Sequence, residues 1–193
     1  MRIAVLASGN GSNFEVIAQA IKDKEIDAEL VLLFSDHHDS YVLERGKKFG
    51  VPCESFELKE FSDKKNYEAA LLELLKRYKA ELVVLAGYMR IIGKELLEAF
   101  PNRIVNIHPA LLPNFPGLHG IKDAYEAGVK ETGVTIHFVD SGVDTGPIIA
   151  QGKVQVAESD RLEDLEKKIH QVEHQLYPQV LAEIVKEFHR DKE

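Results

Sequence analysis

Residues 3–13 of the chain read IAVLASGNGSN, and this stretch decides the fold. Five apolar residues predict a buried β-strand, two glycines allow a sharp turn, and a helical pattern follows over residues 13–22. A strand, a glycine-rich turn and a helix form the opening unit of a doubly wound α/β sheet. The N–H groups that begin such a helix can hold a phosphate, although a tight turn with Ser12 or Asn13 as helix cap explains the same residues.

The alternation of strands and helices continues along the chain. Apolar runs and helical spacing predict strands at 30–34, 52–56, 82–86 and 103–107, and helices at 41–49 and 66–78. Near-continuous apolar strands separated by helices indicate a mostly parallel sheet that is covered on both faces. In such a sheet, ligands bind at the carboxyl ends of the strands.

The pattern changes after residue 108. Two strands at 133–139 and 147–156, joined by a turn-rich loop, predict an antiparallel C-terminal extension of the sheet. A long amphipathic helix follows at 160–187, and Pro178 is expected to kink or break it. Because repeats and linkers are absent, residues 1–193 are expected to form a single α/β domain with a Rossmann-like, doubly wound sheet.

Composition excludes several classes of function. A formal charge of −8 and a pI of about 5.5 give no field that would attract nucleic acid or an anionic membrane. No apolar run approaches the length of a membrane-spanning helix. Cys53 is the only cysteine, so an internal disulfide is excluded, and the chain opens on a strand rather than a signal peptide. A cytoplasmic protein is therefore expected.

The segment NIHPALLP, residues 106–113, carries the clearest chemical signal. Asn106 and His108 lie two residues apart at the end of an apolar strand, so both side chains project from one face. Asp144, in the turn-rich run 140–147, is the candidate carboxylate partner. An amide and a charged imidazole can stabilise the oxyanion and move the proton in acyl-type transfer to an amine. Capping and turn roles for the same three residues are the structural alternative.

Two other motifs indicate different chemistry. The glycine loop followed by Asp36 resembles a nicotinamide-binding pattern, but Phe14 stands where the third glycine of that fingerprint belongs. Residues 170–174 read HQVEH and match an inverted zinc motif, which lacks a third ligand, so no metal is expected. Surface roles are expected for His37 and His38, and a buried packing role is expected for Cys53. His119 and His137 could line the same cleft as His108, although ordinary structural roles are favoured for each and their function stays open.

Seven ordered blocks of sequence resemble the phosphoribosylglycinamide formyltransferase family, the folate-dependent enzymes of purine biosynthesis. The blocks are VLASGNGSN at 5–13, VLAGYMRI at 84–91, NIHPALLP at 106–113, FPGLH at 115–119, HFV at 137–139, DTGPI at 144–148 and EHQLYP at 173–178. The resemblance runs essentially from end to end and implies the formyltransferase fold. It also implies that 10-formyltetrahydrofolate gives its formyl group, without a metal, to the amine of glycinamide ribonucleotide.

The resemblance also implies roles for individual residues. His108 would donate the proton and stabilise the oxyanion, Asp144 would support the charge of His108 and order water, and Asn106 would touch the reacting groups. The nucleotide would be held by Gly11, Ser12, Asn13 and Glu173. The folate would be held by Lys64, Met89, Arg90, Ile91, Ile92, Asn106, Asp140, Ser141, Gly142, Val143 and Asp144.

Three positions depart from the family pattern: Lys64 replaces a frequent arginine, Ala110 a frequent serine and His170 a frequent glutamine. Related functions stay open as alternatives. A formyltetrahydrofolate hydrolase uses water as acceptor, and a methionyl-tRNA formyltransferase needs an added RNA-binding domain and a less acidic surface. A non-catalytic nucleotide-binding module would leave His108 without a purpose. The long C-terminal helix leaves open whether the chain is a homodimer.

Overall fold

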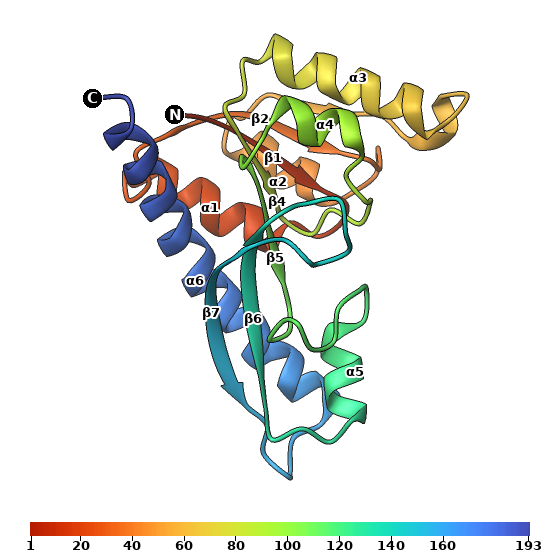
Figure 1. Ribbon diagram of the computed structural model, residues 1–193, viewed down its shortest axis with the longest axis vertical. Coiled ribbons are helices and arrows are strands. Elements are labelled where there is room, and N and C mark those ends of the chain that lie inside the picture. Colours follow the sequence, from red (N-terminus) through yellow and green to blue (C-terminus); the bar gives the residue numbers. More distant parts are fainter.

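The computed structural model describes all 193 residues and contains one seven-stranded sheet (Figure 1). Across the sheet the strands run β3 (Cys53–Ser55), β2 (Glu29–Ser35), β1 (Arg2–Ala7), β4 (Leu82–Leu85), β5 (Ile104–His108), β6 (Glu131–Phe138) and β7 (Ile148–Gln155). The first five strands pair in parallel, whereas β6 pairs antiparallel with both β5 and β7. The doubly wound sheet and its antiparallel extension are confirmed.

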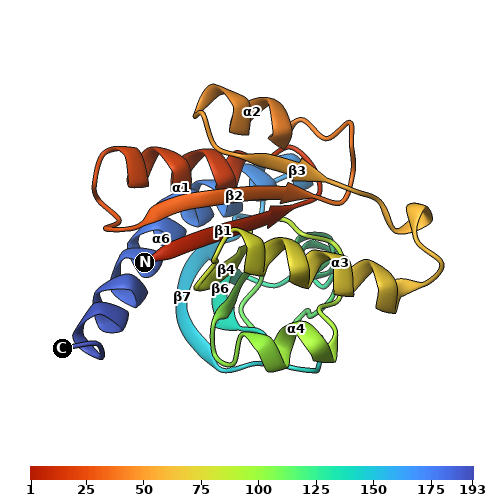
Figure 2. The same ribbon diagram turned by 90° about the horizontal axis from the view of Figure 1, so that it is seen from above.

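Helices cover both faces of this sheet. They are α1 (Ser12–Lys22), α2 (Val42–Lys48), α3 (Lys64–Arg77), α4 (Lys94–Ala99), α5 (Gly120–Glu126) and α6 (Leu162–Arg190), with a short 3-10 turn η1 (Leu58–Glu60). Figure 2 shows α1, α2 and α6 on one side of the sheet and α3 and α4 on the other. This arrangement leaves the carboxyl ends of the parallel strands uncovered, which is where a doubly wound sheet binds its ligands.

Two apolar cores hold the three layers together. On one face, Phe14 and Ile17 of α1 and Ile169 of α6 are buried against the sheet. On the other face, Leu71 of α3 and Leu96 of α4 are buried in a second cluster. The spacing of these side chains follows the helical period, so each helix presents an apolar stripe to the strands.

The C-terminal helix does not break at proline. Helix α6 runs through Pro178 as one continuous element of 29 residues. The expected break is therefore wrong. Proline removes a helical hydrogen bond and costs about 3 kcal/mol in a helix interior. Burial of Tyr177 and Leu181 on either side of Pro178 offsets that cost, because tertiary packing supplies most helical stability in proteins.

The buried hydroxyl of Tyr177 joins α6 to two central strands. Its single O–H is shared between the backbone carbonyls of Leu85 in β4 at 2.8 Å and Val105 in β5 at 3.2 Å. We expect Tyr177→Phe to lower the free energy of unfolding by about 1–2 kcal/mol, since it leaves these buried acceptors without that donor. Urea unfolding measures the loss. The matched control is Tyr41→Phe at an exposed tyrosine, and equal small losses in both variants would contradict the role of Tyr177.

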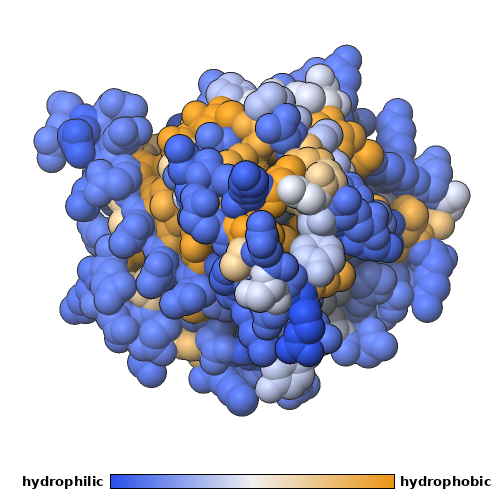
Figure 3. Space-filling view, turned by 90° about the horizontal axis from the view of Figure 1, so that it is seen from below, coloured by the Kyte–Doolittle hydropathy of each residue, from blue (hydrophilic) through white to orange (hydrophobic).

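Two short helices were not predicted from the sequence. Helices α4 and α5 contain six and seven residues, too few for a periodic apolar pattern to stand out. On the face drawn in Figure 3, hydrophilic residues surround apolar ones that gather mainly in its upper and central part. No helix combines the length and the apolar character that crossing a membrane requires.

Candidate active site

Two adjoining cavities open at the carboxyl ends of the parallel strands. The first, here called the main cleft, has a volume of about 310 Å³ and lies beside the ends of β4 and β5. The second, the glycine-loop pocket, has about 410 Å³ and lies beside the loop between β1 and α1. Both are lined by Gly87, Met89, Ile107 and Pro109, so the two cavities meet along a common wall. This geometry suits a reaction between two separately bound ligands.

His108 ends strand β5 and lies in the wall of the main cleft. Its ring is almost fully buried, and Nε2 donates a hydrogen bond to the backbone carbonyl of Phe115 at 2.7 Å. The other ring nitrogen, Nδ1, faces the Asp144 carboxylate at 3.5 Å. Nε2 therefore carries a proton, and Nδ1 is the ring nitrogen that lies at ion-pair distance from a carboxylate.

Asp144 links three parts of the main cleft. One carboxylate oxygen accepts the backbone N–H of Gly117 at 2.8 Å, and the other lies 3.7 Å from Nε2 of His137. Burial alone would raise the pKa of Asp144, but the contact with His137, the Gly117 N–H and the nearby His108 hold that pKa below its ordinary value. Asp144 therefore stays ionised near neutral pH, and its negative charge lies beside the His108 ring.

The amide of Asn106 is oriented by a histidine that the sequence left unassigned. Asn106 lies directly opposite His137 in the antiparallel pairing of β5 and β6. Nδ1 of His137 donates to the carbonyl of Phe138 at 2.9 Å, and its Nε2 lies 3.3 Å from the amide nitrogen of Asn106. The ordinary structural role favoured for His137 is wrong, since this residue lines the main cleft and contacts two of the three candidate catalytic residues.

Strained backbone surrounds the same cluster. Phe115 and Asp144 have φ angles of +52° and +54°, a left-handed backbone conformation that residues other than glycine rarely adopt. Phe115 supplies the carbonyl that His108 binds, and Asp144 supplies its carboxylate neighbour. Such strain persists only where the surrounding structure enforces it and is concentrated at functional sites.

The glycine-loop pocket brings together all four residues expected to hold a nucleotide. Gly11, Ser12 and Asn13 begin α1 without a side-chain cap, so the first N–H groups of the helix are free for an anion. Glu173 of α6 lies on the opposite side and accepts the Asn13 amide at 3.2 Å. His170 donates to Glu173 at 2.7 Å and also lines the pocket.

Gly11 is a position where only glycine fits. Its φ of +83° is left-handed, and a Cβ there would lie 2.3 Å from a methyl carbon of Val42. We expect Gly11→Ala to displace the loop and to raise the KM for the pocket's ligand about tenfold. Steady-state kinetics measures this, with Gly50→Ala as control, because Gly50 is also left-handed but has open space around it. Equal kinetic effects in both variants would contradict a specific role for Gly11.

Most of the residues expected to bind folate line the main cleft. These are Met89, Arg90, Ile91, Ile92, Asn106, Asp140, Gly142, Val143 and Asp144. Lys64 and Ser141 do not line the cleft. Instead they line a groove that adjoins it and shares Ile91 and Ile92. Contact between these two side chains and a ligand in the cleft would therefore require the ligand to extend along that groove.

Asp36 does not face the glycine-loop pocket as a ribose-binding acid would. Only 1% of the residue is exposed, and its carboxylate accepts a hydrogen bond from Nε of Arg90 at 2.8 Å. The Arg90 guanidinium also lies 5.5 Å from the centre of the Tyr67 ring. This pair joins the end of β2 to the segment after β4. The Asp36 carboxylate is therefore not free to bind a ribose, which argues against the nicotinamide-binding alternative.

The histidines of residues 170–174 are bound to protein groups. His170 pairs with Glu173, and Nε2 of His174 lies 3.1 Å from the Ser12 hydroxyl. The Glu173 hydrogen bond raises the pKa of His170, whereas burial lowers the pKa of His174. These contacts join α6 to the start of α1, which connects both histidines with the glycine-loop pocket.

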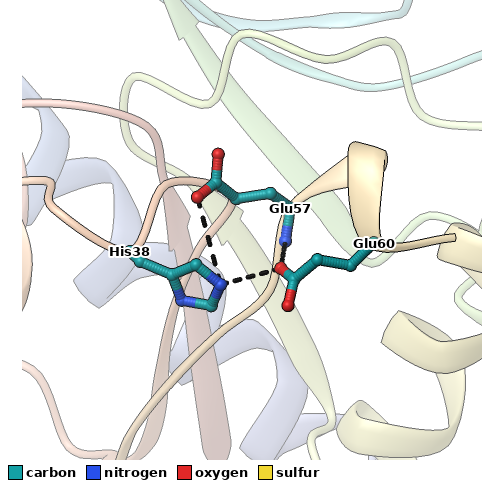
Figure 4. A group of neighbouring side chains, drawn as sticks. All are labelled: His38, Glu57 and Glu60. Atoms are coloured by element: carbon teal, nitrogen blue, oxygen red, sulfur yellow. Dashed lines mark hydrogen bonds and ion pairs between the residues drawn. The ribbon is translucent and has the colours of Figure 1, made fainter.

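Figure 4 shows a further cluster of polar side chains, formed by His38, Glu57 and Glu60. His38 Nε2 lies 2.7 Å from Glu60 and 3.9 Å from Glu57, and His38 Nδ1 lies 2.7 Å from the Ser55 hydroxyl. The three side chains lie close enough together to hold a cation, but each already contacts another member of the cluster. The His37 side chain is 45% exposed, as expected for a surface residue, although it also lines the glycine-loop pocket. Cys53 is only partly buried, but it packs against the apolar core as expected.

Comparison with known proteins decides the family. A model of the family described as formyl transferase matches residues 1–181. The chain belongs to the formyl transferase family. A relative named phosphoribosylglycinamide formyltransferase from Bacillus subtilis (strain 168) is 47% identical over 184 residues, which cover 95% of this chain and 94% of that relative.

Solved structures agree with this membership of the formyl transferase family. The crystal structure of phosphoribosylglycinamide formyltransferase from Bacillus halodurans has a TM-score of 0.94 and 49% identity, covering 96% of this chain and 95% of the other. The same enzyme from Streptococcus pneumoniae TIGR4 has a TM-score of 0.89 and 55% identity, covering 95% of this chain and 98% of the other. The expected formyltransferase fold is confirmed.

Proposed function

We propose that this protein transfers the formyl group of 10-formyltetrahydrofolate to the amine of N1-(5-phospho-D-ribosyl)glycinamide, in de novo purine biosynthesis. The products are formylglycinamide ribonucleotide and tetrahydrofolate. The observation that carries the proposal is the pair of cavities that meet beside His108. A transferase must hold a donor and an acceptor at once, whereas a hydrolase needs only one organic ligand. We propose the cytoplasm as the compartment of the reaction, which the single cysteine supports.

The two cavities suit the two substrates. The main cleft is lined by apolar residues such as Met89, Ile91 and Val143, which match the flat ring system of a folate. The glycine-loop pocket presents the N-terminus of α1, which suits a phosphate, and the Glu173 carboxylate, which suits hydroxyl or amine groups. Because the net charge of −8 repels anions, binding a phosphate requires a local group such as the N-terminus of α1.

The chemistry is an acyl transfer between nitrogen atoms. The nucleotide amine attacks the formyl carbon, a new C–N bond forms, and negative charge develops on the formyl oxygen. The Asn106 amide and the His108 imidazolium line the cleft where they can stabilise that oxygen. The bond from carbon to the folate nitrogen then breaks, the attacking amine loses a proton, and the folate nitrogen gains one through His108. Asp144 favours the protonated form of His108 before it gives its proton to the folate nitrogen, and again when it takes up the proton that the amine loses.

A rate measurement tests the proposal against its alternative. Purified protein is mixed with 10-formyltetrahydrofolate, with and without the nucleotide, and release of tetrahydrofolate is followed in the presence of a chelator. We expect release that requires the nucleotide and is insensitive to the chelator. Equal release without nucleotide would make the protein a hydrolase, and no release under either condition would favour a binding module.

A further inference from the structure

Arg45 of helix α2 lies outside both cavities but is bound to the loop that shapes one of them. Its Nε donates to the backbone carbonyl of Asn10 at 2.8 Å, and its Nη2 donates to the Asn10 side-chain oxygen at 2.6 Å. Its Nη1 pairs with Glu15 in the first turn of α1. One guanidinium therefore joins α2 to both ends of the segment that begins α1.

The neighbours of Arg45 hold the same loop from the same helix. The Val42 N–H donates to the Gly9 carbonyl at 3.0 Å, and the Val42 side chain fills the space beside Gly11. The Tyr41 ring lies against the guanidinium, 5.0 Å from ring centre to carbon. Because the Arg45 side chain is only 17% exposed, it is held in place by these contacts rather than moving freely in solvent.

We propose that Arg45 is a positioning residue for the phosphate end of the nucleotide, acting through Asn10 on the N–H groups at residues 11–13. The proposal rests on the proposed function, which places the phosphate at this loop. Asn10 is exposed and has no secondary structure of its own, so the two hydrogen bonds from Arg45 fix its backbone and its side chain together. Without them, the loop loses the conformation that aims its N–H groups at one point.

Geometry, rather than charge, makes arginine necessary at this position. Glu15 neutralises the guanidinium, so little positive charge remains for an anion in the pocket. The planar guanidinium reaches the carbonyl and the side-chain oxygen of Asn10 at once. A lysine ammonium is a single point and cannot reproduce that fork. Arg45→Lys is therefore expected to behave more like Arg45→Ala than like the parent protein.

Steady-state kinetics of Arg45→Ala and Arg45→Lys tests the proposal. We expect the KM for the nucleotide to rise about tenfold in both variants, while the KM for 10-formyltetrahydrofolate changes less than about twofold. Inorganic phosphate serves as a second probe, and its inhibition constant against the nucleotide should rise in parallel. Thermal unfolding and the unchanged folate KM show that the variants remain folded.

Arg2→Ala is the matched control. Arg2 bonds in a similar way, to the carbonyls of Tyr78 and Lys79 and to Glu29, but it lies at the opposite end of β1. Its loss should affect stability without raising the nucleotide KM. If the parent protein transfers the formyl group and both Arg45 variants keep the nucleotide KM of Arg2→Ala, the role of Arg45 is overturned. If the parent itself shows no nucleotide-dependent transfer, the proposed function fails instead.

Discussion

The His108→Ala variant should lose about 10³-fold in kcat, with little change in the KM of either substrate. A positioned general acid contributes about 10²–10⁴-fold, and an oxyanion donor contributes about 10²–10³-fold. His108 is placed to serve as both, because Asp144 supports its charge and its ring lines the main cleft. Substrate binding relies on other parts of the two cavities, so the loss falls on the chemical step.

A second histidine on the neighbouring loop provides the control for this variant. His119 is exposed, does not line the main cleft and forms no side-chain cap for α5. His119→Ala should therefore keep kcat within about twofold of the parent. Equal rates for His108→Ala and the parent would contradict a catalytic role for His108, provided that circular dichroism shows both proteins to be folded.

The Asp144→Asn variant should lose about 10²-fold in kcat, since a neutral amide cannot support a charged imidazole. The amide is close in size to the carboxylate, so the side chain still fills its place between Gly117 and His137. We expect single-turnover rates to fall as far as steady-state rates, because the loss is in the chemical step. Asp123→Asn at an exposed position of α5 is the control and should leave both rates unchanged.

The ionisation of Asp144 also has a consequence for stability. Its pKa is lower in the folded protein than in the unfolded chain, since the favourable contacts with His137, Gly117 and His108 outweigh burial. The ionised carboxylate therefore stabilises the fold at pH above its ordinary value, about 3.9, and this contribution disappears as pH falls through the lower folded value. The difference in unfolding free energy between the parent and Asp144→Asn should shrink over that acidic range. A difference that grew as pH fell would contradict the assignment.

Almost all of the parallel part of the sheet can be predicted from the sequence. Runs such as 82–86 are apolar throughout and can only be buried on both faces of a sheet, and the loop after residue 7 follows from its glycines. Asn106 and His108 could be recognised because their spacing and the neighbouring prolines depend on adjacent residues alone. Local rules were sufficient wherever the cause of a feature lay within a few residues.

Contacts between distant segments account for what the sequence could not predict. His137 reaches Asn106 through the register of β5 and β6, and only knowledge of that pairing reveals that the two side chains face each other. Arg45 and Asn10 are separated by 35 residues and lack any motif that links them. The continuity of α6 through Pro178 depends on packing across the sheet, which outweighs the local preference of proline to break a helix.

The fate of a labelled formyl carbon tests the central claim most directly. The protein is incubated with 10-formyltetrahydrofolate that carries ¹³C in its formyl group, together with the glycinamide nucleotide, and the products are followed by carbon NMR. We predict that the label moves into a new formamide on the nucleotide, at a rate that falls about 10³-fold in His108→Ala. Label recovered as free formate, at the same rate whether or not nucleotide is present, would contradict the account.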